Sequence, residues 1–130
     1  MYDPRRRYVT SARVRRHHCV FPHVDGWATA GTDSGVMQIV GAGVARSENR
    51  SIRVVGCCPQ GITRAPSDPP DKDLVDLEPH HNDFVLVPSS EWGGETTTMF
   101  TLAAVLLEHI PGVAVLANGG QISMKEVSAA

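Results

Sequence analysis

Apolar positions along the chain follow two kinds of pattern. Short apolar runs, typical of buried strands in a parallel sheet, lie at residues 26–32, 51–57, 83–88 and 112–117. Apolar residues spaced three and four apart, typical of amphipathic helices, lie at residues 34–46 and 95–109. Strands and helices that alternate in this way predict an α/β fold, a Rossmann-like parallel sheet flanked by helices in three layers.

The first predicted helix, residues 34–46, is indicated by a stripe with a spacing of four and two apolar residues beside it: Val36, Val40, Val44, Met37 and Ile39. Gly41 and Gly43 lower the helix propensity of this segment. We therefore expect both glycines to allow close packing of the helix on the sheet.

The segment from residue 59 to residue 81 is predicted to be a long loop because it contains five prolines. A helical turn is expected within it at residues 72–77. Loops of this length in compact domains are often functional lids.

The first 25 residues differ from the rest, since six arginines crowd a stretch with no clear hydrophobic period. We interpret residues 1–25 as a basic N-terminal arm or a degenerate first element, and residues 26–130 as a ligand-binding domain. A solvated tail is the plainer alternative to an arm that binds nucleic acid or acidic lipid. Val20 and Phe21 are too short an apolar run for a strand, so the first strand of the sheet is expected to be missing.

The composition argues against several classes of protein. A net charge of −2 argues against nucleic acid as a partner. No apolar run approaches the ~20 residues that a membrane helix needs, so no membrane insertion is expected. Three cysteines without a disulfide framework indicate a reducing, cytoplasmic location. The sequence contains neither a CxxC nor an HxxxH pair, and we expect no metal and no other cofactor.

Two glycine-led turns follow predicted strands and open predicted helices. The first is AGTDSGVM at residues 30–37, in which Gly31 and Gly35 permit unusual backbone conformations and the close approach of a ligand. The helix start behind it carries unpaired N–H groups and about half a positive charge, which attract a phosphate. The other residues expected at this site are Thr32, Asp33, Ser34 and Val36. Asp33 would cap the helix or hold a ribose hydroxyl. The alternative to a ligand site is a strand-to-helix turn that needs glycine for its geometry alone.

The second turn is EWGGETT at residues 91–97. Gly93 and Gly94 open the helix, and Trp92 either stacks on a base or is buried for structural reasons. Glu95 favours the helix dipole and can accept hydrogen bonds from ribose hydroxyls. The hydroxyl of Thr96 either faces a polar ligand or caps the helix locally. Two such turns at one edge of a sheet predict a pocket for a ligand that carries phosphate.

Three further kinds of residue lie near these turns. Arg64 is placed to reach a phosphate from the long loop, or is a solvated loop arginine. His80 and His81 are more typical of hydrogen-bonded surface groups than of a catalyst. Cys57 and Cys58 are interpreted as packing residues on opposite faces of a strand.

Four segments together resemble the SLOG superfamily, and within it the bacterial branch related to the N-terminal domain of melastatin-type TRP channels (LSDAT). AGTDSGVM at residues 30–37 is similar to the family turn GGTxxGVM, and VVGCCPQGI at residues 54–62 is similar to the strand end IGIAPWGI. LEPHHNDF at residues 77–84 is similar to LDPNHTHF, and WGGET at residues 92–96 is similar to WGDES. The matches keep their order and spacing over residues 26–127.

The resemblance implies a Rossmann-like fold that binds a nucleotide-derived ligand such as ADP-ribose or an NAD-related molecule. It places Pro59, Gly61 and His81 at the site beside the two turns. The LOG enzymes of this superfamily hydrolyse nucleoside monophosphates with a PGGxGTxxE motif, in which Phe100 of this chain stands for the catalytic glutamate. Phenylalanine cannot do acid–base work, so the chain is expected to be non-catalytic unless a shifted register lets Glu95 substitute.

The resemblance also implies a first strand that ends in a glycine-rich loop and completes the pocket. Since residues 1–25 show no such strand, the chain is expected to be truncated or completed by a partner subunit. The sheet edge left exposed would favour a homodimer.

Three functions follow from these observations. The leading hypothesis is a sensor of a nucleotide-derived ligand. The alternatives are a LOG-like nucleoside monophosphate phosphoribohydrolase and a structural or interaction remnant whose pocket has decayed.

Overall fold

The computed structural model describes residues 7–10, 26–49, 51–108, 111–113 and 128. Within them, four parallel strands form one sheet in the order β1-β6-β3-β2. The strands are β1 (Arg7–Thr10), β2 (Gly26–Thr29), β3 (Arg53–Pro59) and β6 (Asp83–Val87). Because all four run in the same direction, their carboxyl ends lie at one edge of the sheet. The predicted α/β, Rossmann-like class is confirmed.

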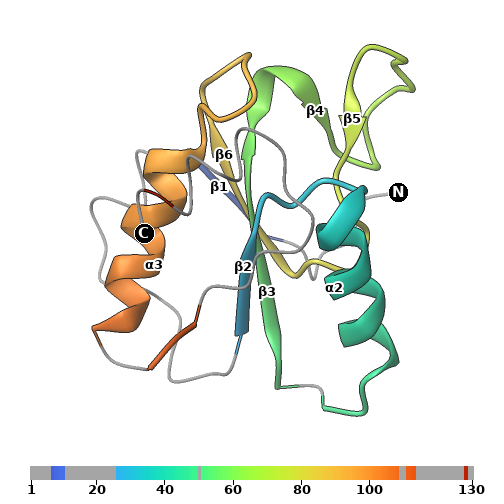
Figure 1. The fold of residues 1–130 in the computed structure, drawn as a ribbon. Helices are drawn as coiled ribbons and strands as arrows, with labels where there is room; N and C mark the ends of the chain where they lie inside the picture. Colours follow the sequence, from blue (N-terminus) through green and yellow to red (C-terminus); the bar gives the residue numbers. More distant parts are fainter. Residues whose placement is uncertain (1–6, 11–25, 50, 109–110, 114–127, 129–130) are drawn as a thin grey trace.

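Helices cover both faces of this sheet (Figure 1). Helix α2 (Gly35–Arg46) lies against one face, and helix α3 (Thr96–Leu107) lies against the other. Each helix begins at the carboxyl edge, the position where open parallel sheets bind their ligands. Neither helix is long and apolar enough to cross a membrane.

Apolar side chains fill the space on both sides of the central strands. One cluster consists of Val55, Cys57, Val85, Val87 and Leu102, with Met99 of α3 packed against it. A second consists of Cys58, Leu77 and Phe84, with Ala65 and Leu86 beside it. Cys57 and Cys58 belong to different clusters because successive side chains of a strand alternate between faces. The expected opposite orientation of these two cysteines is confirmed.

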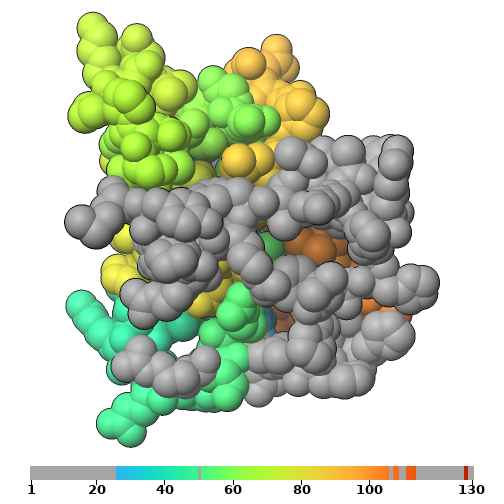
Figure 2. All heavy atoms as spheres, turned by 180° about the vertical axis from the view of Figure 1, so that it is seen from behind, coloured from blue at the N-terminus to red at the C-terminus, as the bar shows by residue number. Residues whose placement is uncertain are grey.

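The long loop after β3 contains structure of its own. It includes the short 3-10 helix η1 (Gln60–Ile62) and strands β4 (Thr63–Arg64) and β5 (Val75–Asp76), which pair in parallel. The helical turn expected at residues 72–77 is wrong, since β5 lies there. Pairing with β4, and the bridge between Leu77 and Thr32, override the local preference. This loop and the loop before α3 project from the same end of the molecule (Figure 2).

A strand does form within the first 25 residues, which corrects the expectation that none precedes Gly26. Strand β1 pairs in parallel with β6, with Tyr8 opposite Phe84. Its four residues are too few to show a hydrophobic pattern. The strand is defined instead by its backbone hydrogen bonds to β6. Since this strand is present, the homodimer is no longer supported by a sheet edge left open by a missing strand. Residues 11–25, where a glycine-rich loop was sought, lie outside the described residues.

The apolar stripe of α2 differs from the predicted one. The side chains that face inward are those of Met37, Val40 and Val44, whereas Val36 and Ile39 are exposed, Ile39 to 71%. Helix geometry explains the shift, because Met37, Val40, Gly41 and Val44 follow the i, i+3, i+4, i+7 spacing of one face. The strand predicted at residues 112–117 lies largely outside the described residues.

Candidate functional site

The first glycine turn is held tightly by its neighbours. Gly31 has a φ of 73°, and a Cβ atom there would lie 2.6 Å from Cys58 Sγ and 2.7 Å from Gly56 Cα. Only glycine fits a position that combines a left-handed backbone with such close contact. Gly31 is therefore required for the packing of this turn against β3, whether or not a ligand binds there.

Most amides of this first turn bind acceptors within the protein. The N–H of Gly31 donates to Thr29 Oγ1 at 2.9 Å. The N–H of Asp33 donates to the carbonyl of Asp76 at 2.8 Å, and that of Ser34 donates to the carbonyl of Thr32 at 2.8 Å. Thr32 is buried, and its hydroxyl lies 3.2 Å from the hydroxyl of Ser34. The turn itself is thus a self-satisfied scaffold for the helix that follows.

The start of α2 remains open. Ser34 is the N-cap residue, but its side chain makes no capping hydrogen bond. Gly35 has a φ of 52°, and a Cβ atom there would meet nothing within 4 Å. Among the described residues, no acceptor binds the first N–H groups of the helix, those of Gly35, Val36 and Met37. These amides point out of a helix start that carries about half a positive charge.

The glycine amides of the turn before α3 are bound within the protein, which corrects the expectation that they are free. The N–H of Gly93 donates to Oε2 of Glu95 at 2.9 Å, and the N–H of Gly94 donates to the carbonyl of Glu91 at 3.2 Å. The N–H of Thr96 donates to the carbonyl of Gly93 at 3.2 Å. Glu95 is buried and lies just before the helix, so a negative charge lies beside this helix start and opposes an anion there. Among the described residues, no acceptor binds the N–H groups of Thr97 and Thr98.

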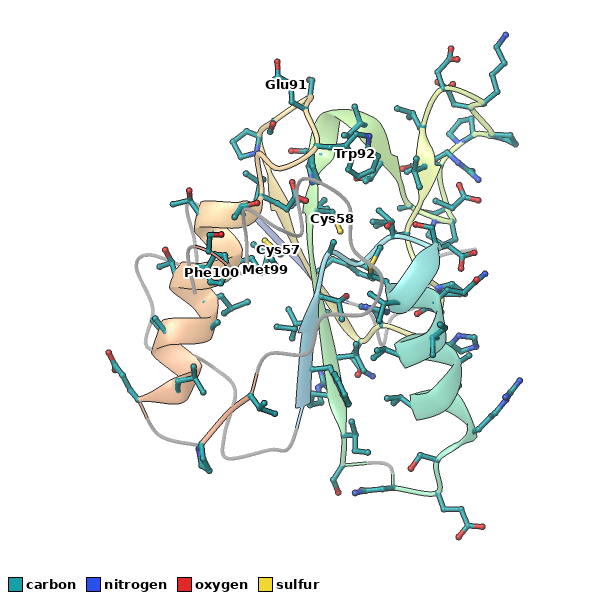
Figure 3. The ribbon with its side chains drawn as sticks, viewed as in Figure 1. Cys57, Cys58, Glu91, Trp92, Met99 and Phe100 are labelled. Carbon is teal, nitrogen blue, oxygen red and sulfur yellow. The ribbon has the colours of Figure 1, made fainter. Side chains whose placement is uncertain are left out.

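Trp92 and Phe100 occupy different surroundings (Figure 3). The side chain of Trp92 is 46% exposed on the loop before α3, at the carboxyl edge, where a base could stack on it. Phe100 lies one turn into α3 and is half-buried. An apolar ring at that place offers no group for proton transfer.

The long loop contacts the loop of the second turn through Gly61. Gly61 donates its N–H to the carbonyl of Ser89 at 2.9 Å, in the loop that leads to Gly94. Pro59, at the end of β3, accepts a hydrogen bond from Thr63 Oγ1 at 2.7 Å. The structure thus places Gly61 beside the loop of the second turn, whereas the hydrogen bond of Pro59 lies within the long loop.

Arg64 is engaged within the protein. Its Nε donates to Asp76 Oδ1 at 2.8 Å, and its Nη1 donates to the carbonyl of Asp68 at 2.9 Å. Since the carbonyl of Asp76 also binds Asp33, the guanidinium group lies beside the first turn. A phosphate would reach it only by competing with the carboxylate of Asp76.

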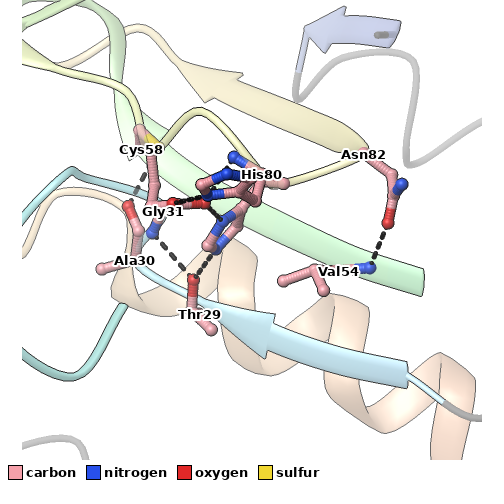
Figure 4. A network of polar contacts seen from close by, with 9 residues as sticks. Thr29, Ala30, Gly31, Val54, Cys58, His80 and Asn82 are labelled. Atoms are coloured by element: carbon pink, nitrogen blue, oxygen red, sulfur yellow. Dashed lines mark hydrogen bonds and ion pairs between the residues drawn. The ribbon is translucent and has the colours of Figure 1, made fainter. Parts of the chain in front are cut away.

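His81 is a buried core histidine rather than a surface group. Only 2% of it is exposed, and its ring stacks on Phe84 with the ring centroids 5.7 Å apart. Its Nδ1 lies 2.7 Å from Glu78 Oε2, and its Nε2 lies 2.6 Å from Thr29 Oγ1 (Figure 4). Both ring nitrogens are therefore used inside the protein.

Glu78 is the centre of this buried network. Its carboxylate accepts hydrogen bonds from the backbone N–H of His80 at 2.8 Å, from His80 Nδ1 at 2.9 Å and from His81 Nδ1. Burial alone would raise the pKa of Glu78, but the hydrogen bonds from His81 and His80 outweigh it and lower that pKa below the ordinary value. The group is thus a carboxylate at neutral pH.

The two described cysteines are inert thiols. Both are free and fully buried. Burial, with a smaller contribution from the charge of Glu95, raises the pKa of Cys57 to about 12. Burial also raises the pKa of Cys58, with smaller contributions from Cys57 and Glu95. Neither is available as a nucleophile, because the thiolate is the reactive form. Within the described part of the chain, no cluster of three or more potential ligands could hold a metal ion.

Comparison with known families identifies the chain. The family described as "SLOG in TRPM, prokaryote" matches residues 17–130, which is most of the sequence. The chain therefore belongs to this SLOG family, as the four motifs indicated. No curated protein matches it.

Sequence reasoning missed Glu78 and Thr29. Glu78 stands in the motif LEPHH, where a carboxylate followed at the third position by histidine is a weak signal for a hydrogen-bonded pair. Thr29 is a polar residue at the end of a strand. Nothing in the sequence indicates that these two residues meet the same histidine, because 52 positions separate Thr29 from His81.

Proposed function

We propose that this protein is a non-catalytic sensor domain for a nucleotide-derived ligand such as ADP-ribose or an NAD-like molecule. The observation that supports it most directly is the open start of α2. Three amides there lack acceptors among the described residues, next to a glycine with empty space in front of it. An anion, most simply a phosphate, satisfies such amides.

The other parts of the proposed site lie at the same carboxyl edge. Trp92 offers an exposed ring for a base, and Asp33 offers an exposed carboxylate for a ribose hydroxyl. Within this proposal, residues 26–130 form the ligand-binding domain, and residues 1–25 contribute an edge strand. The two buried, free cysteines agree with the proposed cytoplasmic location.

Hydrolysis is the weaker alternative. Glu95, the only replacement considered for the glutamate of the LOG motif, uses its carboxylate to bind the Gly93 amide. A general acid must instead reach its substrate within hydrogen-bond distance. We therefore do not assign it a catalytic role.

Isothermal titration with ADP-ribose, NAD and AMP tests the proposal. We expect at least one of them to bind the wild-type protein. Gly35→Val places a branched side chain in front of the α2 amides and should weaken binding about tenfold or more, the loss expected for one charge-assisted hydrogen bond. Gly43→Ala is the matched control, because it adds a Cβ in open space further along the same helix.

Two results would contradict this function. A folded wild-type protein that binds none of the three nucleotides would favour the structural or interaction remnant. Unchanged affinity in Gly35→Val would show that the phosphate does not bind at the start of α2.

A further inference from the structure

The buried network around Glu78 lies directly behind the first glycine turn. Glu78 and His81 are only 1% and 2% exposed, so neither can contact a ligand in solution. Because Nδ1 of His81 faces a carboxylate, this nitrogen carries a proton and donates it to Glu78. In the neutral ring, Nε2 is then the acceptor, and the hydroxyl of Thr29 donates to it at 2.6 Å.

The hydroxyl of Thr29 connects the ring of His81 to the backbone of the turn. While its proton is directed at His81, its oxygen accepts the N–H of Gly31 at 2.9 Å. The chain of hydrogen bonds thus runs from Glu78 through His81 and Thr29 to the backbone of the first turn (Figure 4).

Glu78 also contacts the turn and helix α2 directly. Its backbone N–H donates to the carbonyl of Gly31 at 2.9 Å. A Cβ atom at Gly41 of α2 would overlap the carboxylate of Glu78, whereas one at Gly43 would meet nothing. The missing side chain of Gly41 therefore lets α2 lie against the same carboxylate that orders the turn. Of the two glycines expected to allow close packing, only Gly41 does so, and its neighbour is Glu78.

We infer that Glu78, His81 and Thr29 are positioning residues that hold the first glycine turn and the start of α2 in the geometry that binds the anion. This inference rests on the proposed function and assigns the geometry of its site to a buried chain of hydrogen bonds. His81 acts on the ligand through Thr29 and Gly31, and not by contact.

Thr29→Val and Thr29→Ser are the matched variants that test the inference. Valine keeps the branched shape of threonine and removes the hydroxyl, whereas serine keeps the hydroxyl and removes a methyl group. Affinity for the ADP-ribose, NAD and AMP panel should fall about tenfold in Thr29→Val, the size of one unmade buried hydrogen bond. It should stay within about threefold of wild type in Thr29→Ser. The amide of Gly31 should exchange its hydrogen faster in Thr29→Val than in Thr29→Ser.

The two glycines of α2 provide a second test that leaves the strand untouched. Gly41→Ala should weaken binding by moving the helix away from Glu78, and Gly43→Ala should bind as wild type does. Circular dichroism and melting temperature establish that each variant is folded at the temperature of the titration.

Specific results separate this inference from the proposed function. If the wild-type protein binds no nucleotide, the proposed function fails, and the inference fails with it. If the wild-type protein binds and Thr29→Val binds equally well, or loses only melting temperature, the inference alone is overturned. An equal loss in Thr29→Ser and Thr29→Val would also overturn it, because the hydroxyl would then not be the cause.

Discussion

The starts of α2 and α3 look alike in sequence and differ in chemistry. Both follow a parallel strand and a turn with two glycines, and both lie at the carboxyl edge. At α3 the carboxylate of Glu95, the residue before the helix, is buried and binds the Gly93 amide, whereas the carboxylate of Asp33 before α2 is exposed. Each turn has an acidic residue two positions after a glycine, Asp33 after Gly31 and Glu95 after Gly93. Among the described residues, only the Glu95 carboxylate binds an amide of its own turn, and its negative charge opposes an anion at the start of α3.

The two starts are also supported differently. The turn before α2 is packed against β3 and against the Glu78 network. The turn before α3 is packed against the side chain of Ser89, which lies in the same loop between β6 and α3. Because the two turns are supported differently, we expect substitutions in them to change the free energy of unfolding by different amounts.

Gly31→Ala should have the largest effect on stability. A left-handed backbone costs a residue other than glycine about 1–2 kcal/mol, and the added Cβ overlaps Gly56 and Cys58. With the overlap included, we expect the free energy of unfolding to fall by about 3 kcal/mol. Urea denaturation measures this loss, with Gly43→Ala as a control that should be neutral or gain up to about 1 kcal/mol. A loss below about 1 kcal/mol would show that the turn is more adaptable than its packing indicates.

Gly41→Ala and Gly94→Ala compare the supports of the two helices. The Cβ at Gly41 overlaps a buried carboxylate that three hydrogen bonds hold in place, and we expect a loss of about 2 kcal/mol in the free energy of unfolding. The Cβ at Gly94 overlaps the side chain of Ser89, which lies on a half-exposed loop that can shift. Its loss should be about half as large. Equal losses in urea denaturation would contradict the view that α2 has the more rigid support.

Glu95→Gln should have a small effect on stability and a clear effect on anion binding. The amide keeps an acceptor for Gly93 but loses the charge, so the free energy of unfolding should fall by about 1 kcal/mol. Without the negative charge, the start of α3 should accept an anion. Inorganic phosphate should therefore raise the melting temperature of the variant more than that of the wild type. An equal response of the two proteins would mean that Glu95 does not keep anions away from α3.

Much of the fold could be predicted from the sequence because it depends on local patterns. The unbroken apolar run at Phe84–Leu86 indicates a strand buried on both faces, and adjacent Cys57 and Cys58 must point to opposite faces. The glycine turns are visible as well, since the left-handed backbone of Gly31 and Gly35 needs glycine. The short β1 escaped prediction because four residues carry too little pattern, and β5 did so because its partner strand lies twelve residues away.

The sequence by itself determined the α/β class, the family and the positions of the two glycine turns, because each depends on residues close together along the chain. Only the tertiary structure decided which helix start has a buried carboxylate beside it, since hydrogen-bond partners are chosen by distance in space. The carboxylate of Glu78 contacts Gly41 and His81, the Arg64 guanidinium binds Asp76, and the Glu95 carboxylate binds the Gly93 amide before α3. Folding pairs almost every buried polar group with a partner, whereas the exposed amides at the start of α2 have no acceptor within the part of the chain that the structure describes.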